Sequence, residues 1–501
     1  MKSDQDPQPV SWWRRKPSLR LTEEQILRDA QVSQERRRER LQLLPGALLI
    51  GLASGAVAVA FRWSLEVMEA ARTDCLRSLS WGWRVALVSG LVFVGTSVSL
   101  YSVRRFSRAA AGSGVPQLLG VLRGKRVMNW FSLLLVKFFG SLFAIGGGLA
   151  LGKAGPTVQM GGAVAEAMSG LTSRLGGHGE DAQRVRDRNV LLAAGSGAGL
   201  AAVFNAPLAG LIFVLEVFQR GFAPRVFFVT FLACVLADTV TRGTLGQMSV
   251  YTLEDIRLPP LWSLPLFVLL GVGSGLVGVA FNRGLLVSLE GMEAVRRWPV
   301  WGVGLLAGGV VGLVASWNVD LLGTGHELVA GALGGEARSA PWLLLCVLLR
   351  FGLTLFSCGT GAPGGIFAPL LVLGSLFGLL YGQVSKALLP VDSLQPSAFA
   401  LVGMAALFTG VVRAPLTAIV LIMEMTSGYD LVLPLMAACL SAWGMADYLG
   451  DKPIYEVLLE RDLQAEQERI QRNTENLPGT GGEAAPSEGG TLDTKGPVRE
   501  S

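Results

Sequence analysis

Long blocks of apolar residues, separated by short charged segments, constrain the fold of this chain more than any other feature. Examples are residues 44–60, 85–103 and 264–281, and a shorter block covers 342–349. A helix needs about 20 apolar residues to cross a bilayer. Asp, Glu, Lys and Arg make up only 16% of the residues, against about 25% in ordinary soluble domains. The sequence therefore predicts an all-α polytopic membrane protein and excludes a soluble, collagen-like or disulfide-stapled secreted chain.

The charged segments predict how the chain is oriented. The run QERRRER at 34–40 directly precedes the first long apolar block, and basic residues return after the second block, between 104 and 126. Because Lys and Arg favour the cytoplasmic side, we expect a multi-pass protein of the cell membrane with both termini in the cytoplasm. These flanking residues account for the net charge of +5, so nucleic acid is not an expected partner.

Four segments are expected along the chain. Residues 1–44 form a cytoplasmic tail, 45–245 a first membrane repeat, 246–456 a second repeat, and 457–501 a cytoplasmic, largely disordered tail rich in Gly, Pro, Ser and Glu. A capping-box pattern at 22–25 opens the stretch TEEQILRDAQ. It predicts either a short amphipathic helix at the membrane face or a solvated tail helix.

An internal repeat relates the two membrane segments. Three landmarks recur in the same order, with spacings that differ by only a few residues. Repeated halves are typical of transporters, whose substrate sites lie between the repeats near the bilayer midplane. The matching pairs are GLASGAVAVAF (51–61) with GVGSGLVGVAF (271–281), GKAGP (152–156) with GIFAP (365–369), and APLAGLIFVLEV (206–217) with APLTAIVLIMEM (414–425).

Glycine and proline interrupt the apolar segments at equivalent places in the two halves. The breaks lie at 146–162 and 359–369, and AGSGVPQ at 111–117 forms a third. Broken helices persist at membrane depth only inside protein or along a watery cavity. Since proline suits the first turn of a helix, each break is expected to begin a helix whose free N–H groups attract an anion. Close packing of helices by small residues is the alternative explanation.

Other chemistries have little support. The segment GGLALGK at 147–153 resembles the start of a P-loop, but Ala154 stands where Ser or Thr must bind Mg²⁺. Five dispersed cysteines, together with His178 and His326, form no metal-ligand or disulfide pattern. No metal or other cofactor is expected. A membrane-embedded enzyme is an alternative of a different class, but no nucleophile–base set is visible.

Taken together, these motifs resemble a known family, the CLC chloride channels and H⁺/Cl⁻ exchange transporters, in its prokaryotic type without CBS domains. The signatures GSGxP, GK/RxGP and GxFxP stand in order at 112–116, 152–156 and 365–369, with NAPLAG at 205–210 and a tyrosine beyond the last span at Tyr455. The resemblance implies an inverted-repeat bundle of broken, partly spanning helices in the lipid bilayer. It further implies a homodimer with one pathway per subunit for chloride or a similar halide.

The resemblance also implies a central chloride site. Its ligands would be the hydroxyl groups of Ser113 and Tyr455 and the backbone N–H groups of Ile366 and Phe367. In the family, serine at the position of Ser113 accompanies chloride preference and proline accompanies nitrate preference. Several donors must converge because a bare buried ion costs tens of kcal/mol, whereas one helix terminus contributes about 0.3–2 kcal/mol.

An outer site would use the backbone N–H groups around Lys153, Ala154 and Gly155. Lys153 would raise the local potential without binding the ion directly. Exchangers of the family carry a glutamate at the position of Ala154, where its carboxylate acts as the gate and carries the proton. A methyl group can do neither.

The inner end of the family's proton path is also substituted. Val217 occupies the position of the inner proton glutamate, and Leu119 replaces a further glutamate found nearby in exchangers. We therefore predict passive chloride transport, uncoupled from protons. The alternative is H⁺/Cl⁻ antiport, either because Ala154 is an engineered gate substitution or because Glu216 or water serves the proton path. For Glu216 and its repeat equivalent Glu424 we favour a structural role.

Overall fold

A computed structural model describes residues 23–175, 181–246, 259–334, 338–389, 394–426 and 428–475 of the chain. Within these residues the fold is helical, and nine helices are long and apolar enough to cross a membrane. The prediction of an all-α, multi-pass membrane protein is therefore confirmed. His178, residues 1–22 of the predicted N-terminal tail and residues 476–501 of the predicted C-terminal tail lie outside the described residues.

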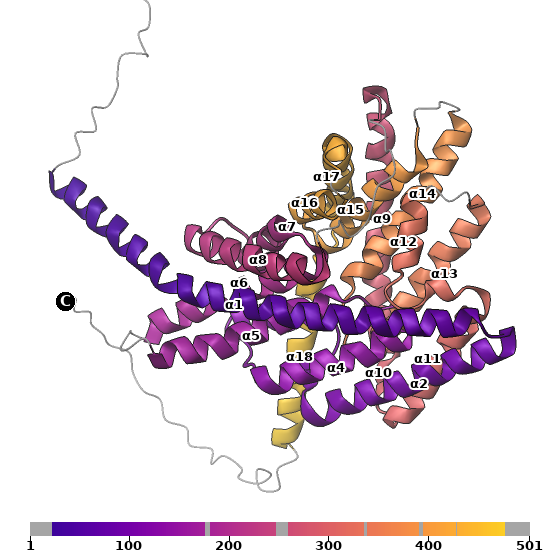
Figure 1. Ribbon diagram of the computed structural model, residues 1–501, viewed down its shortest axis with the longest axis horizontal. Coiled ribbons are helices and arrows are strands. Elements are labelled where there is room, and N and C mark those ends of the chain that lie inside the picture. Colours follow the sequence, from indigo (N-terminus) through magenta and orange to yellow (C-terminus); the bar gives the residue numbers. More distant parts are fainter. Residues whose placement is uncertain are drawn as a thin grey trace, which may run out of the picture.

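Two series of helices follow one another along the chain (Figure 1). The first comprises α1 (Glu23–Arg77), α2 (Trp81–Phe106), α3 (Val115–Leu122), α4 (Trp130–Gly147), α5 (Ala154–Leu175), α6 (Asp181–Phe204), α7 (Pro207–Phe213) and α8 (Pro224–Leu245). The second comprises α9 (Leu264–Gly291), α10 (Glu293–Arg296), α11 (Val300–Trp317), α12 (His326–Leu333), α13 (Ala340–Gly359), α14 (Phe367–Leu388), α15 (Pro396–Val412), α16 (Pro415–Thr426), α17 (Val432–Tyr448) and α18 (Ile454–Glu475).

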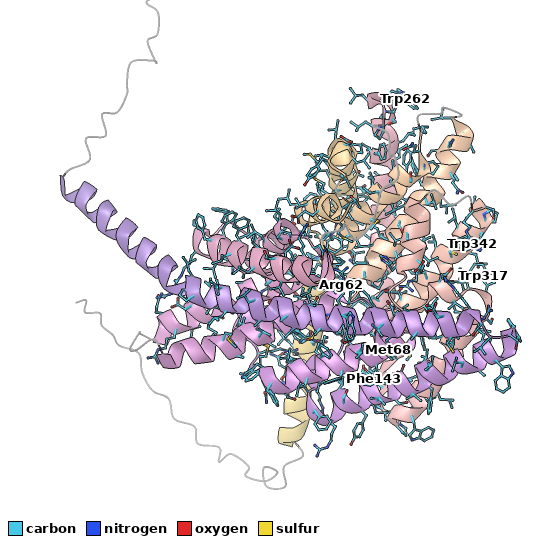
Figure 2. All side chains as sticks on the ribbon, viewed as in Figure 1. Arg62, Met68, Phe143, Trp262, Trp317 and Trp342 are labelled. Atoms are coloured by element: carbon cyan, nitrogen blue, oxygen red, sulfur yellow. The ribbon has the colours of Figure 1, made fainter. Side chains whose placement is uncertain are left out.

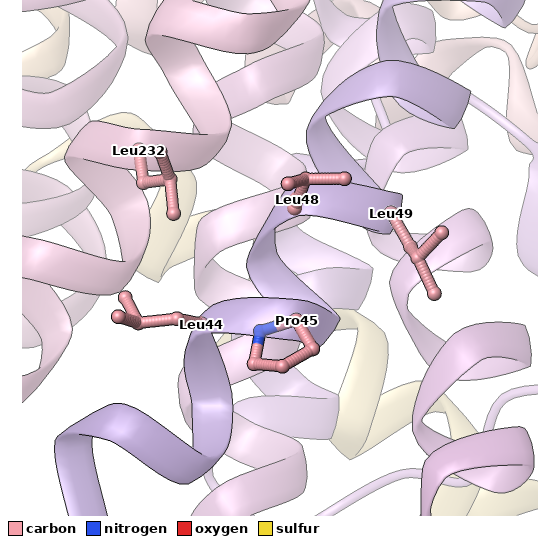
Figure 3. A pocket seen from close by; sticks show the side chains of 5 residues that line it. All are labelled: Leu44, Pro45, Leu48, Leu49 and Leu232. Carbon is pink, nitrogen blue, oxygen red and sulfur yellow. The ribbon is translucent and has the colours of Figure 1, made fainter.

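The first helix is longer than the sequence analysis expected. The segment predicted as a separate N-terminal helix is continuous with the first membrane span in α1, although Pro45 lies inside it. Proline removes one backbone hydrogen bond from a helix interior. Around Pro45, the side chains of Leu44, Leu48, Leu49 and Leu232 line an apolar hollow between α1 and α8 (Figure 3).

Equivalent helices of the two repeats pack in equivalent ways. α5 lies against α6 as α14 lies against α15, and α1 lies against α8 as α9 lies against α17. Glycines bring the first two pairs into close contact. A Cβ atom on Gly161 would meet the carbonyl oxygen of Gly195 at 2.1 Å, and one on Gly374 would meet that of Gly403 at 2.5 Å. Such small residues allow membrane helices to approach closely, so part of the glycine content has the packing role considered in the sequence analysis.

The most buried helices are those nearest the Gly/Pro breaks. Every residue of α15 from Ala398 to Val412 is buried, and most of α14 is buried with it. Phe367, the first residue of α14, contacts Phe204, Phe213 and Phe408. By contrast, tryptophans such as Trp262 and Trp317 lie at the periphery of the bundle (Figure 2), as is typical of membrane interfaces.

Candidate anion pathway

The three Gly/Pro breaks meet at one place in the fold. Gly152 and Gly365 exchange two backbone hydrogen bonds of 2.7 Å each, in an antiparallel bridge between equivalent positions of the two repeats. The N–H group of Gly364 donates to the carbonyl oxygen of Gly112 at 3.0 Å. The starts of α3, α5 and α14 are therefore tied together although they are far apart in the sequence.

Gly155 shows how tightly these helix starts converge. A Cβ atom at this position would lie 2.6 Å from the carbonyl oxygen of Ser113, 2.9 Å from its hydroxyl oxygen, and 2.8 Å from the Cα of Gly365. No side chain fits in this space without moving the backbone. Glycine is therefore needed at 155 for close approach of the segments that carry the predicted chloride ligands.

The four predicted ligands of the central site come from the starts of α3, α14 and α18. Ser113 precedes α3, Ile366 and Phe367 begin α14, and Tyr455 lies in the first turn of α18. All four are buried. Among the described residues, the backbone N–H groups of Ile366 and Phe367 have no hydrogen-bond acceptor. A helix start with free donors of this kind is suited to an anion.

Two hydroxyl groups complete the polar lining. Within the part of the chain that the structure describes, neither the Ser113 hydroxyl nor the Tyr455 hydroxyl makes a hydrogen bond, and both oxygens are buried. Burial raises the pKa of Tyr455 well above its ordinary value. The phenol therefore stays protonated and can donate. Buried polar groups without a hydrogen-bond partner are rare and call for an explanation. An anion bound between the two hydroxyls would explain why neither has a partner in the protein.

Sequence reasoning missed the residue that holds the first break in place. The side chain of Lys137 is completely buried in α4, and its ammonium group donates to the carbonyl oxygens of Ala110 (3.0 Å) and Gly112 (2.6 Å). Those bonds orient the loop that carries Ser113. The available signal was a single lysine inside the apolar segment WFSLLLVKFFGSLF, since a charge at membrane depth is costly and points to a specific role.

The predicted outer site has a charged cluster beside it. The Lys153 ammonium group lies 3.5 Å from a carboxylate oxygen of Glu66, and the same oxygen accepts a 2.8 Å hydrogen bond from Arg62, on α1 (Figure 2). The methyl group of Ala154 is fully buried. Ala154 and Gly155 are the first residues of α5, so their N–H groups belong to the helix start as predicted.

Glu216 lies at the contact between the repeats. Its carboxylate accepts hydrogen bonds from the N–H groups of Leu416 (3.1 Å) and Thr417 (2.8 Å) and from the Thr417 hydroxyl (2.7 Å). It therefore caps the start of α16. Its neighbour Val217 packs against the hydrophobic core within the π-helical turn η3 (Val214–Gln219), and the side chain of Leu119 is buried.

Comparison with known proteins decides the family. A sequence model of the family "Voltage gated chloride channel" matches residues 95–447. The chain belongs to this family. The CLC resemblance and the CLC-type inverted-repeat bundle are thus confirmed, and chloride transport is the activity of the family.

Individual relatives refine this family assignment. The chain is 39% identical to the H⁺/Cl⁻ exchange transporter ClcA of Vibrio parahaemolyticus, over 86% of this chain and 92% of that protein. It is 40% identical to the H⁺/Cl⁻ exchange transporter ClcA of Vibrio cholerae, over 83% of this chain and 89% of that protein. A crystal structure of a slow cyanobacterial Cl⁻/H⁺ antiporter aligns with a TM-score of 0.76 at 34% identity, over 84% of this chain and 98% of that one.

These relatives overturn the mechanism expected from single positions. The prediction of passive chloride flux, uncoupled from protons, is wrong. Proteins that are similar to this chain over most of its length are H⁺/Cl⁻ exchange transporters, and a protein of similar structure is a Cl⁻/H⁺ antiporter. The alternative of antiport fits these findings better. The error came from reading two substitutions, at Ala154 and Val217, as deciding a property of the whole pathway.

Proposed function

We propose that this protein exchanges chloride for protons across a cell membrane. The observation that carries the proposal is the identity of 38–40% to H⁺/Cl⁻ exchange transporters over more than four fifths of the chain. The anion pathway gives this exchange a physical basis. Free N–H groups at the start of α14 and two unpaired buried hydroxyls converge near the contact of the two repeats.

Chloride would be held in this pathway by partial charges. The Ser113 and Tyr455 hydroxyls and the N–H groups of Ile366 and Phe367 would replace part of its hydration shell, as predicted for the central site. Lys153 would raise the potential of the outer site while paired with Glu66. Binding by dipoles suits transport because the ion must leave as readily as it enters.

The proton route in this chain differs from the one that the family resemblance implies. Neither Ala154 nor Val217 has a group that can take a proton, and Glu216 is engaged in capping α16. We therefore assign the proton path to water in the pathway. Because the side chain of Ala154 is only a methyl group, the outer end of the pathway has no carboxylate gate.

A homodimer in the lipid bilayer, with one pathway per subunit and both termini cytoplasmic, is part of the same proposal. α7 and α16 are too short to span a bilayer, yet they expose Leu208 (46%) and Leu416 (61%). The half-buried carboxylate of Glu216 lies in η3, directly after α7, and that of Glu424 lies on α16. Because a carboxylate facing lipid is costly, a second copy of this chain is the proposed cover. Ion exchange, with no enzymatic reaction, is the proposed activity.

The decisive experiment uses purified protein in liposomes loaded with concentrated KCl and diluted into the potassium salt of an impermeant anion at equal K⁺ concentration, with an interior made slightly more acidic than the exterior. Valinomycin is added so that K⁺ balances the charge, and external chloride and pH are recorded together. Antiport predicts that chloride efflux drives protons inward against their gradient, so the external pH rises, and that a protonophore abolishes the rise. Chloride efflux without proton uptake would overturn the proposal, and protein-free liposomes are the control.

A further inference from the structure

The last helix, α18, carries Tyr455 but buries little apolar surface. Of its described side chains, Ile454, Tyr455 and Leu459 are buried, while Leu458 and Leu463 are partly buried against the core. Most of the other described side chains of α18 are charged or polar. Because stabilisation by apolar contacts grows with the area that they bury, charged contacts have a large share in fixing where this helix begins.

The position of the Tyr455 phenol depends on that first turn of α18. Among the described residues the Tyr455 hydroxyl has no hydrogen-bond partner, so no bond at the hydroxyl itself fixes its distance from the proposed chloride ion. Hydrogen bonds depend steeply on distance and angle. A small displacement of the first turn therefore weakens the bond from Tyr455 to the ion.

Glu456, the neighbour of Tyr455, binds two arginines from different elements. Its carboxylate accepts a 2.7 Å hydrogen bond from Arg123 and forms an ion pair with Arg220. Burial favours the neutral form of the acid, but the guanidinium groups of Arg123 and Arg220 outweigh it and hold the pKa of Glu456 below its ordinary value. The carboxylate is therefore ionised at neutral pH, and both contacts join full charges, which strengthens them.

Arg123 places one of these contacts at the end of α3. It is the C-cap residue of this eight-residue helix, and Ser113 lies just before the other end. Ser113 and Tyr455 are proposed ligands of the same chloride ion. The helices α3 and α18 therefore meet twice, at the central site and at the ion pair of Arg123 with Glu456.

Arg220 extends the contact to the first repeat. It directly follows η3 and has φ = +54°, a left-handed conformation that is costly for residues other than glycine. Such a conformation persists where the surrounding structure holds it, and here the side chain of Arg220 is held by Glu456. Since Glu216 of η3 caps α16, the same short segment contacts both α16 and α18.

We propose that Glu456 is a positioning residue for chloride transport, which binds Arg123 and Arg220 and thereby holds the Tyr455 hydroxyl at the central site. This inference rests on the proposed transport of chloride and on the proposed role of Tyr455. It adds a residue that sets chloride affinity without touching the ion. It also links the η3 segment of the first repeat to a ligand that follows the second.

The experiment measures chloride binding by calorimetry in Glu456→Gln, a change that keeps the size of the side chain and removes its charge. The Kd for chloride should rise about threefold, which is part of the loss expected when a hydrogen bond to a charged group is removed altogether. In a Tyr455→Phe background the same change should have no effect, because no hydroxyl remains to be positioned. An equal rise in that background would overturn the proposal.

Arg220→Gly tests the second contact. Glycine relieves the left-handed backbone while the ion pair is lost, so thermal stability should change little but the Kd for chloride should rise. Added to Glu456→Gln, the change should raise the Kd no further, because the partner charge is already gone. If Glu456→Gln fails to fold, Arg220→Gly, alone and with Tyr455→Phe, carries the test.

Glu460→Gln is the matched control. Glu460 lies one turn further along α18 and pairs with Lys452 at 3.4 Å, but its side chain is 57% exposed, against 18% for Glu456. Exposed ion pairs contribute little, so the Kd should equal that of the parent. Equal Kd values for Glu456→Gln, Glu460→Gln and the parent would overturn the positioning role. Absence of proton coupling in the parent would overturn the proposed exchange but leave this comparison of chloride binding valid.

Discussion

Glu216 and Glu424 each cap a helix of the opposite repeat. Glu216, from the first repeat, accepts its hydrogen bonds from the first turn of α16. Glu424, at the other end of α16, accepts two bonds of 3.1 and 2.8 Å from the first turn of α7. A carboxylate at a helix N-terminus satisfies free N–H groups and complements the helix dipole. This reciprocal arrangement joins the two repeats.

The first prediction compares Glu216→Gln with Glu424→Gln. Since both residues cap helices in equivalent ways, each change should lower the stability of the folded protein by about 1 kcal/mol, measured by thermal unfolding in detergent. The ratio of chloride to protons transported should stay the same in both variants. If coupling fell in Glu216→Gln alone, with the two stabilities equally reduced, Glu216 would be part of the proton path.

The second prediction concerns the fully buried Ala154. Ala154→Glu adds a carboxylate that competes with chloride at the start of α5, and an advantage of about 1.4 kcal/mol for the carboxylate would slow chloride flux about tenfold. Because protonation removes the negative charge, flux through the variant should rise as the pH falls. Ala154→Gln, of equal size but without a charge, should show no such pH dependence. Matching pH profiles for the two variants would contradict the position of the outer site.

A third prediction tests the two hydroxyls of the central site. Tyr455→Phe and Ser113→Ala each remove one donor to chloride, and a hydrogen bond to a charged group contributes about 1.5–3 kcal/mol. Chloride binding, measured by calorimetry, should therefore weaken about tenfold or more in each variant. Since the Tyr455 hydroxyl has no protein partner among the described residues, Tyr455→Phe should not lower stability in the absence of halide. Undiminished chloride affinity in both variants would remove these hydroxyls from the site.

The fourth prediction concerns the buried lysine of α4. Lys137→Met leaves the carbonyl oxygen of Ala110 without its donor and removes one of the two donors to the carbonyl oxygen of Gly112; an unsatisfied buried group costs about 1–3 kcal/mol. We expect lower thermal stability and also weaker chloride binding, because the loop carrying Ser113 loses its anchor. Lys386→Met, at an exposed position, is the control and should change neither. Normal chloride affinity in a folded Lys137→Met protein would argue against an anchoring role.

Much of the fold and several site positions could be predicted from the sequence. The apolar blocks led to the membrane spans, and the Gly/Pro breaks led to the starts of α5 and α14, at Ala154 and Phe367. These are local properties, because backbone hydrogen bonding and proline chemistry act within a few residues. The continuity of α1 through Pro45 was not expected, because a proline in a helix interior has a local cost in free energy. Packing of α1 against α6 and α8 outweighs that cost.

Local patterns of residues are enough to predict a repeated membrane chain with anion-attracting helix starts and the motifs of its family. The packed helices were needed to show that Gly155 touches Ser113 and Gly365 and that Lys137 holds the first break. They also gave Glu216 a capping partner in the other repeat. The physical reason is that these contacts join residues far apart in the chain. Their distances follow from how whole helices pack, which no local pattern of residues specifies.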